Sequence, residues 1–415
     1  MRILQFGPVP PEAGGIGTGG VATHAWKLST HLAERGHEVA VAADNFRASS
    51  ELPVNMDGVK IYGTCYAPRV VLRQGVSLLS NTPTLVKLTR HCWGMVGPVG
   101  IGYTFAWYEY VIRAFRPEIV HVHHLERRFP FAHYAARRKH TPVVTTVHST
   151  TSVKFATGAE RERNLRFIKK NAHLARDIVF GFKTRMNEFL SLLDEDEKTH
   201  LRCWLVPYPM DSSLYFPLPR SEACLKLGMS PDRTMVLFAA NLVPLKGAAT
   251  LLMAVALLAR RQRELGFDVI IVGGGPQHAE LAEAIQQYGL EPYVKLVGPK
   301  TPADLLYYYN AAALFVLPSK EEALPTTAFE AIQCGCPVVV STNVAPEMLP
   351  PPDIAHSVPP DDERALAAAI EVCLKRKWDR EKISDYIRQF DWHEGTAANV
   401  TRFEELYLRL TEKAQ

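Results

Sequence analysis

The sequence predicts an α/β protein of two domains, each a parallel β-sheet covered by helices on both faces. Three observations lead to this prediction. The chain has 415 residues, more than one ordinary domain usually holds. Short apolar runs alternate with amphipathic stretches in both halves, which is typical of parallel sheets with crossover helices. A proline-rich stretch at residues 207–219 separates the halves and is the best candidate for a linker.

The front half contains seven short apolar segments that we expect to form strands. A helix is expected between the first two, over residues 21–35, because Gly36 follows it as a stop signal. The expected strands are residues 2–6, 38–43, 59–62, 118–122, 142–147, 177–180 and 203–206.

The back half repeats the alternation more regularly. Expected strands are residues 235–240, 268–272, 294–297, 314–317 and 337–341. Expected helices are residues 248–263, 277–288, 302–310, 327–334 and, at the end of the chain, 391–412. The predicted organisation is an N-terminal domain over residues 1–212, a second domain over 213–390, and a final helix over 391–415 that crosses back to the first domain.

Composition excludes several classes of protein. No apolar run is long enough for a transmembrane helix, and the N-terminus lacks the features of a signal peptide. Seven scattered cysteines show no metal-binding spacing, so reduced thiols in a cytoplasmic protein are expected. Residues 92–107 carry no charge and suit either a membrane interface or the lead into a buried helix over 103–115. The buried helix is favoured, because it is the commoner use of such a stretch.

The net charge of +4 is unevenly distributed. The first 211 residues hold 27 Lys and Arg against 18 Asp and Glu, whereas the remainder holds 20 against 25. A basic front half suits an anionic or lipid-linked acceptor, or peripheral contact with a membrane. An ordinary solvated surface explains the same charge and is the favoured interpretation. No nucleic-acid partner is expected.

A glycine-rich segment follows the first expected strand. Residues 15–20 fit G-x-G-x-x-G, and Asp44 ends the next strand, which together outline a dinucleotide-binding fingerprint. The fit is loose, because Pro8, Pro10 and Pro11 separate the strand from the glycines. We therefore interpret the segment as a phosphate-approach loop at a helix N-terminus. A turn without a ligand remains an alternative, and an NAD-dependent oxidoreductase is the least favoured one.

Two loops of the back half follow strand ends. Residues 241–247 begin with Asn241 and contain Lys246, which can neutralise the charge of a diphosphate leaving group. Residues 273–275 are three glycines, with Gly274 at their centre, and allow a ligand to approach the backbone. Each signal is weak alone, since loop lysines and glycine turns are common.

Residues 321–330 carry the strongest candidate site. Glu322 follows the strand at 314–317, where open α/β sheets bind ligands, and Glu330 lies in the next helix. Both carboxylates can accept hydrogen bonds from sugar hydroxyls. Between them the helix N-terminus offers N–H groups to phosphate, and the residues concerned are Leu324, Pro325 and Thr326. The alternative is that Thr327 and Glu330 form a capping box and that Glu330 only caps its helix.

Histidines mark two strand ends of the front half. His148 follows the strand at 142–147 and can donate a hydrogen bond to a sugar hydroxyl. His121, His123 and His124 lie one strand earlier and suggest zinc. That interpretation is disfavoured, because no further ligand spacing accompanies them and buried strand histidines are often structural. No metal site is therefore predicted.

Together these motifs resemble the GT-B nucleotide-sugar transferases of the large glycosyltransferase family four, over nearly the whole chain. The similar segments are residues 19–24 with 35–39, 119–123, 146–149, 322–330 with 335–339, and 390–392. The resemblance implies two Rossmann-like domains facing across a cleft. It also implies a retaining transfer of a hexose or N-acetylhexosamine from a UDP- or GDP-sugar, without metal or other cofactor.

The resemblance also implies roles for individual residues. Glu322 would contact the donor sugar and Glu330 the ribose, while Lys246 would bind the diphosphate. Gly20 would approach the phosphate, and His148 would contact the transferred sugar. Asn241 stands where the family usually has arginine, and Ala323 where it usually has glycine. These departures motivate the alternative of a weakly active or regulatory nucleotide-sugar-binding subunit.

Overall fold

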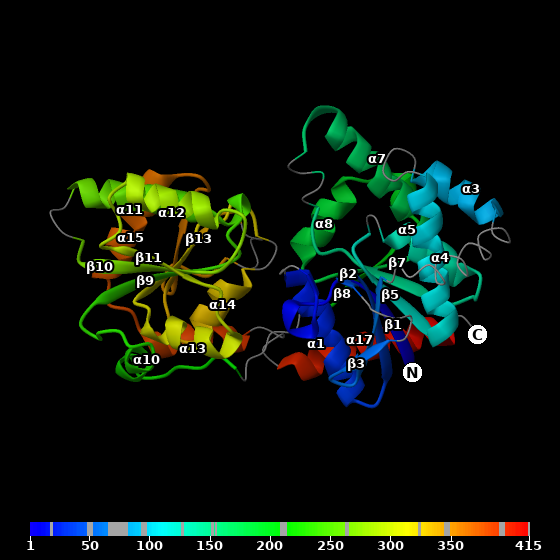
Figure 1. Ribbon diagram of the computed structural model, residues 1–415, viewed down its shortest axis with the longest axis horizontal. Coiled ribbons are helices and arrows are strands. Elements are labelled where there is room, and N and C mark those ends of the chain that lie inside the picture. The colour runs from blue at the N-terminus through cyan, green and yellow to red at the C-terminus, as the bar shows by residue number, and fades with distance from the viewer. Residues whose placement is uncertain are drawn as a thin grey trace. The chain divides into compact units, whose positions relative to one another are not determined.

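The computed structural model forms two compact units, which are described separately (Figure 1). Unit 1 comprises Met1–Pro209 and Thr396–Gln415, and unit 2 comprises Met210–Gly395. The structure describes residues 1–16, 20–47, 53–64, 82–92, 98–125, 128–150, 153, 156–207, 214–261, 265–322, 325–343, 349–389 and 395–413.

Unit 1 is built on an eight-stranded sheet of order β3-β4-β2-β1-β5-β6-β7-β8. Its strands are β1 Arg2–Phe6, β2 Glu38–Arg47, β3 Val54–Met56, β4 Val59–Thr64, β5 Ile119–His123, β6 Val143–Thr146, β7 Asp177–Phe180 and β8 Arg202–Leu205. All neighbours are parallel except β3, which pairs antiparallel with β4. The seven predicted strands are confirmed, and β3 was missed. Its signal is the Asp57-Gly58 turn, where both residues have positive φ, as a tight hairpin requires.

Helices cover both faces of this sheet, as predicted. One face carries α3 Thr82–His91, α4 Pro98–Phe115, α5 Phe129–Arg137 and α7 Gly158–Leu174, with α8 Lys183–Ser191 and the short α9 Glu195–Lys198 beyond them. The other face carries α1 Gly20–Glu34 and α17 Gly395–Glu412. Two separate apolar cores result, one on each face of the sheet.

The uncharged stretch at residues 92–107 leads into α4, and the structure confirms the buried-helix interpretation for its described part. Phe105, Trp107 and Tyr108 are almost fully buried. The ring of Tyr108 stacks on Phe6 of β1 with a centroid separation of 4.2 Å. The indole Nε1 of Trp107 donates to the carbonyl of Gly63 at 3.1 Å. The apolar side chains of α4 therefore belong to the core of unit 1.

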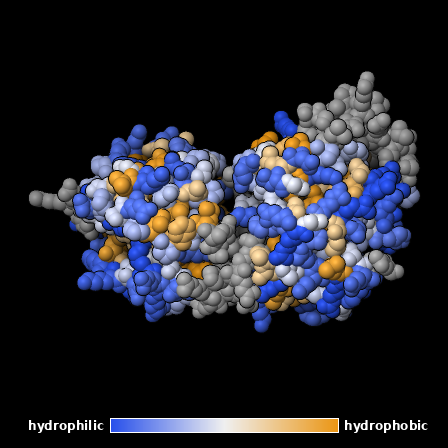
Figure 2. Space-filling model, turned by 90° about the horizontal axis from the view of Figure 1, so that it is seen from below, coloured by the Kyte–Doolittle hydropathy of each residue, from blue (hydrophilic) through white to orange (hydrophobic). Residues whose placement is uncertain are grey.

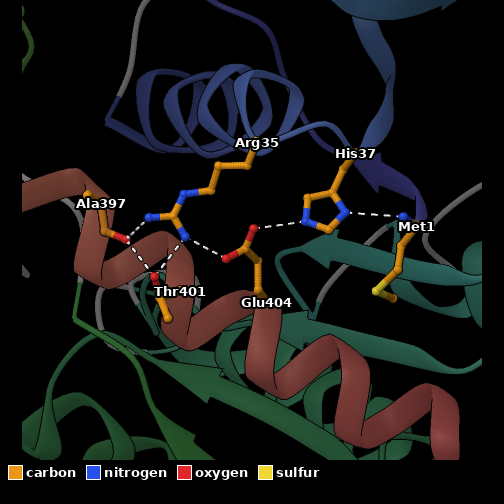
Figure 3. Close-up of polar contacts among 6 residues, drawn as sticks. All are labelled: Met1, Arg35, His37, Ala397, Thr401 and Glu404. Atoms are coloured by element: carbon orange, nitrogen blue, oxygen red, sulfur yellow. Dashed lines mark hydrogen bonds and ion pairs between the residues drawn. The ribbon is translucent and has the colours of Figure 1, made fainter.

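The last helix, α17, packs inside unit 1 although it follows unit 2 in the chain. Its Val400, Phe403 and Tyr407 are fully buried in the core shared with α1. A polar network fixes its exposed side (Figure 3). Glu404 accepts from Arg35 at 2.5 Å and from His37 at 2.8 Å.

Unit 2 contains a six-stranded, fully parallel sheet of order β11-β10-β9-β12-β13-β14. Its strands are β9 Thr234–Ala239, β10 Phe267–Val272, β11 Val294–Gly298, β12 Leu314–Leu317, β13 Val338–Ser341 and β14 Ala355–Val358. The five predicted strands are confirmed, and β14 is an addition. Numbered within the unit, the order is 3-2-1-4-5-6, so the winding direction reverses between β9 and β12.

The helices of unit 2 are α10 Arg220–Lys226, α11 Ala248–Arg261, α12 His278–Gln287, α13 Pro302–Ala311, α14 Thr326–Gln333, α15 Glu363–Lys375 and α16 Arg380–Asp385. The four helices predicted between the strands of unit 2 are present as α11, α12, α13 and α14, and α10, α15 and α16 are additions. Two parallel sheets with helical layers confirm the predicted α/β class. On the face drawn in Figure 2, apolar residues lie in patches between hydrophilic ones. Among the described helices, none is both long and apolar enough to cross a membrane.

Candidate functional site

The candidate site of unit 2 lies at the carboxyl edge of its sheet, where the winding direction reverses. Strands β9 and β12 are parallel neighbours, with Leu314 opposite Val236. Open α/β sheets bind ligands at the edge where the loops after such neighbouring strands leave in opposite directions. Lys246 lies in the loop after β9 and Glu322 in the loop after β12. The topology therefore brings together two residues that are 76 positions apart in the chain.

Lys246 and Glu322 form an ion pair at this edge. The Nζ of Lys246 donates to Oε1 of Glu322 at 2.5 Å, and the hydroxyl of Ser319 donates to the same oxygen at 2.9 Å. The Glu322 side chain is 8% exposed and that of Lys246 is 25% exposed. Burial makes the interaction stronger than a surface pair, because less water screens it. The sequence predicted both residues but gave no sign that they pair or that Ser319 joins them.

The backbone around the pair is tightly constrained. Lys246 ends a short 3-10 helix, Pro244–Lys246, and Gly247 follows with φ of 75°. A Cβ on Gly247 would lie 2.2 Å from the carbonyl oxygen of Pro318 in the loop after β12. The amide of Lys320 donates to the carbonyl of Leu245 at 2.8 Å. The two loops thus hold each other in place.

The three glycines after β10 serve two different purposes. Gly273 and Gly275 have φ of 144° and 154°, and a Cβ on either would collide with carbonyl oxygens of the loop after β9. They are required by the fold. A Cβ on Gly274 would meet only Pro299, at 3.8 Å. The structure therefore has room for a Cβ at Gly274, the glycine that the sequence predicted to face a ligand. Asn241 lies half-buried in the loop that these glycines contact.

Glu330 lies inside α14 and does not cap it. The helix begins at Thr326 with Pro325 as N-cap, and no side chain caps it. The capping-box alternative is therefore wrong. Instead, Oε2 of Glu330 accepts from the hydroxyl of Tyr309 at 2.7 Å. Burial and the nearby Glu330 carboxylate raise the pKa of Tyr309 well above its usual value, so this hydroxyl stays protonated and donates.

The helix N-terminus beside Glu322 is in a position to meet a ligand. Pro325 is buried and Thr326 is exposed at the first helical position. In this first turn the N–H of Ala328 already donates to the carbonyl of Pro325 at 3.0 Å, so the N–H groups of Thr326 and Thr327 are the ones that can bind an anion. Leu324 and Ala323, which the sequence placed in the same site, lie outside the described residues.

The glycine-rich segment of unit 1, like the glycines after β10, contains both a glycine that the fold requires and one that has room for a Cβ. A Cβ on Gly15 would lie 1.9 Å from the carbonyl oxygen of Val9, so this glycine is needed for the turn. Gly20 begins α1 and is exposed, and a Cβ placed on it would meet nothing within 4 Å. Asp44 accepts two hydrogen bonds from Arg128, at 2.9 and 2.5 Å, and is thus already engaged by the protein. Residues 17–19 lie outside the described part.

A group of buried histidines occupies the carboxyl edge of the unit 1 sheet, where its winding reverses between β1 and β5. His148 is 7% exposed and His123 is fully buried. Nε2 of His148 lies 3.1 Å from Nδ1 of His123, whose Nε2 lies 2.7 Å from Oε1 of Gln5. His24 of α1 completes the group, with ring centroids 5.2 Å from His148 and 5.6 Å from His123.

Burial keeps these histidines neutral. It lowers the pKa of His24 to about 3, and it lowers the pKa values of His123 and His148 well below 6.5. His121 belongs to the same buried layer and is bonded by Tyr407 and Thr146, each at 2.7 Å. Its structural role agrees with the sequence interpretation. Gln5 and His24 were not predicted as site residues, because only the fold brings β1 and α1 to these strand ends.

Two family descriptions match most of the chain. Residues 18–180 match "Glycosyltransferase Family 4", and residues 223–390 match "Glycosyl transferases group 1". A D-inositol 3-phosphate glycosyltransferase of Gordonia bronchialis is 27% identical over 343 residues, which is 78% of this chain and 69% of that protein. One from Kineococcus radiotolerans is 28% identical over 359 residues, covering 82% of this chain and 77% of that protein.

Solved structures share the fold over nearly the full length. Sucrose-phosphate synthase from Thermosynechococcus elongatus superimposes with a TM-score of 0.75 at 20% identity, covering 99% of both chains. The Anabaena protein HepE, solved in complex with UDP-glucose, gives a TM-score of 0.66 at 17% identity, covering 100% of this chain and 98% of that one. At such identities the likeness establishes the fold alone.

Proposed function

Because the chain belongs to the group 1 glycosyltransferases of the GT-B fold, we propose that it transfers a hexose or N-acetylhexosamine from a UDP- or GDP-sugar to an acceptor hydroxyl, with retention of configuration. The observation that carries the proposal is the ion pair of Lys246 and Glu322 at the edge where the winding of the unit 2 sheet reverses. Open α/β sheets bind nucleotides at such an edge.

The donor fits the groups around this pair. Lys246 neutralises the charge that develops on the leaving diphosphate, and the N-terminus of α14, which follows Pro325, offers the N–H of Thr326 as a further donor. Glu322 accepts hydrogen bonds from sugar hydroxyls. Gly274 lets the nucleotide approach the backbone, since its Cβ position is open.

Further residues complete the proposed donor site. Glu330, oriented by Tyr309, accepts from the ribose hydroxyls. Asn241 contributes an uncharged amide where the family usually has arginine. Leu324, which follows Glu322 in the sequence, is proposed to contact the donor as well. The substitution of an amide for a guanidinium weakens diphosphate binding by about 1.5–3 kcal/mol if no other group replaces the contact.

Transfer with retention follows a same-face route. The leaving phosphate oxygen accepts the proton of the attacking acceptor hydroxyl on the face from which the phosphate departs. His148 contacts the transferred sugar, and Gly20 leaves the first turn of α1 open to phosphate. Lys246 and the helix N-terminus supply the charge neutralisation for the step, so we propose that it requires no metal or other cofactor.

The acceptor is proposed to be anionic or lipid-linked. Two similar proteins are named D-inositol 3-phosphate glycosyltransferases, which describes a phosphorylated acceptor for those proteins.

Unit 1 also has a cavity of about 660 Å³ at the edge where β6, β7 and β8 begin. It is lined by Arg137, Arg176 and Lys413, and its single described acidic residue, Asp177, is paired with Arg202 at 2.6 Å. This cationic lining favours peripheral contact with anionic lipid.

The transfer is tested by a donor screen. Released nucleotide is measured with UDP- and GDP-sugars and candidate phosphorylated acceptors, and the anomeric configuration of the product is read by NMR. Lys246→Ala is expected to abolish transfer, whereas Lys375→Ala, on the exposed end of α15, is the matched control. Full activity of folded Lys246→Ala contradicts the proposed site. Nucleotide binding by calorimetry without any transfer supports the regulatory-subunit alternative instead.

The membrane contact is tested separately. Flotation with vesicles is compared with and without anionic lipid, for the wild type and for the double variant Arg137→Ala/Arg176→Ala. Anionic lipid is expected to increase flotation of the wild type and to have less effect on the variant. Equal flotation with both vesicle types removes the contact from the proposal without affecting the donor site.

A further inference from the structure

We propose that His24, His123 and His148 form a binding site for a transition-metal ion of the zinc type. The three side chains come from separate elements, namely α1, the end of β5 and the loop after β6. One ligand nitrogen from each lies within 4.8 Å of the others, and all three residues are buried. Convergence of three imidazoles from distant parts of the chain is the geometry that a three-histidine metal site needs.

The spacing requires only a small adjustment to hold zinc. Zn–N bonds are about 2.0–2.1 Å long, so two imidazole nitrogens on a tetrahedral ion lie about 3.3 Å apart. Nδ1 of His123 and Nε2 of His148 already lie 3.1 Å apart. The ion would replace the hydrogen bond that now joins these two nitrogens. For His24 to coordinate as well, its imidazole would have to move toward the other two rings, by about as much as a change of side-chain rotamer provides.

The surroundings supply the outer contact that metal-bound histidines usually have. Oε1 of Gln5 lies 2.7 Å from Nε2 of His123 and accepts a hydrogen bond from it, which leaves the lone pair of Nδ1 directed toward His148. When the ion binds, the proton that His148 carries on Nε2 in its hydrogen bond to His123 would move to the Nδ1 of His148. Three imidazoles with one open position suit Zn²⁺, Cu²⁺ or Ni²⁺, whereas Mg²⁺ and Ca²⁺ prefer oxygen ligands.

The consequence for activity is inhibition. A metal ion on His148 would hold the ring that contacts the transferred sugar, and this part of the inference rests on the proposed function. Metal binding itself does not, because it depends only on the three histidines. Zinc is thus expected to inhibit the transfer, which is proposed to need no metal.

The site is tested by metal binding measured independently of activity. The wild type is titrated with ZnCl2 by calorimetry and with Co²⁺ by visible absorption, which reports a tetrahedral site. One ion per chain is expected. His24→Ala and His24→Gln are both expected to weaken binding at least about tenfold, while His140→Gln, an exposed histidine, is the matched control. Unchanged affinity in folded His24 variants overturns the proposal.

A second measurement needs no variant. Anomalous diffraction at the zinc absorption edge, from a wild-type crystal soaked in ZnCl2, is expected to place the ion between the three rings. An ion found only elsewhere, for example on a cysteine, overturns the proposal. Zinc inhibition of transfer is measured in parallel. If no transfer is detected with any donor, the proposed function fails, yet the binding result still decides the metal site.

Discussion

The ammonium of Lys246 donates to the carboxylate of Glu322 at 2.5 Å, across the edge where the winding of the unit 2 sheet reverses. The side chain of Glu322 is only 8% exposed, so its carboxylate would lose stability if the ammonium of Lys246 were removed. The pair therefore contributes to the stability of unit 2 as well as to the proposed transfer, and the two contributions can be measured separately.

Lys246→Met is expected to lower the free energy of unfolding of unit 2 by about 1–3 kcal/mol, because it leaves a buried carboxylate with the hydroxyl of Ser319 but without its cation. Glu322→Gln in the same chain is expected to restore most of that stability without restoring transfer. Chemical denaturation and a transfer assay measure the two effects. Recovery of both stability and transfer in the double variant contradicts a donor-binding role for the pair.

Gly273 and Gly274 are adjacent but are expected to respond oppositely to alanine. Gly273→Ala places a Cβ 1.9 Å from the carbonyl oxygen of Ala240 at φ of 144°. The backbone strain alone costs about 1–3 kcal/mol, and the collision adds to it, so the thermal midpoint should fall or the chain should fail to fold. Gly274→Ala should keep the wild-type midpoint and raise KM for the donor. A lowered midpoint in Gly274→Ala would show that its glycine serves the fold.

Glu404 is expected to hold α17 on unit 1. Glu404→Ala removes the shared acceptor of Arg35 and His37 (Figure 3). We expect a loss of about 1–2 kcal/mol, since two partly shielded donors lose a charged partner. Glu405→Ala, on the exposed side of the same helix, is the matched control. Hydrogen exchange of the α17 amides and chemical denaturation check the result, and equal behaviour of the two variants would contradict it.

Buried thiols make stability fall at alkaline pH. Burial raises the pKa of Cys336 to about 12 and those of Cys92 and Cys373 to about 11, from 9.0. Below pH 9 the thiols are neutral in both the folded and the unfolded chain. Above pH 9 the unfolded chain releases protons that the folded chain retains, so stability falls until the folded pKa values are reached. The loss is about 1.4 kcal/mol per pH unit for each thiol.

Denaturation in the presence of a reductant, at pH 8 and pH 10, measures this slope. Cys336→Ala should reduce the fall of the free energy of unfolding with pH by the contribution of one thiol. The smaller side chain also lowers stability at pH 8. An identical slope in Cys336→Ala and the wild type would show that this thiol ionises equally in both states.

The six described cysteines are free, and five of them are buried, so their interior positions agree with the expectation of reduced thiols.

The sequence by itself determined the elements and their class. Alternating apolar runs predicted the strands of both sheets, because a fully buried parallel strand needs a continuous apolar segment. The exceptions are the edge strands β3 and β14, in which exposed residues interrupt the buried pattern. Glu322, Lys246 and Gly274 could also be predicted as candidate site residues, since strand ends in this class carry the site.

Only the tertiary structure decided which of these residues meet and what each is for. It paired Lys246 with Glu322 through the strand order, turned Glu330 toward Tyr309 instead of the helix end, and separated the fold-bearing Gly273 from the open Gly274. It also brought His24 beside His123 and His148. The physical reason is that periodicity records which side of an element is buried, whereas contacts between residues far apart in the chain depend on how strands are ordered in the sheet.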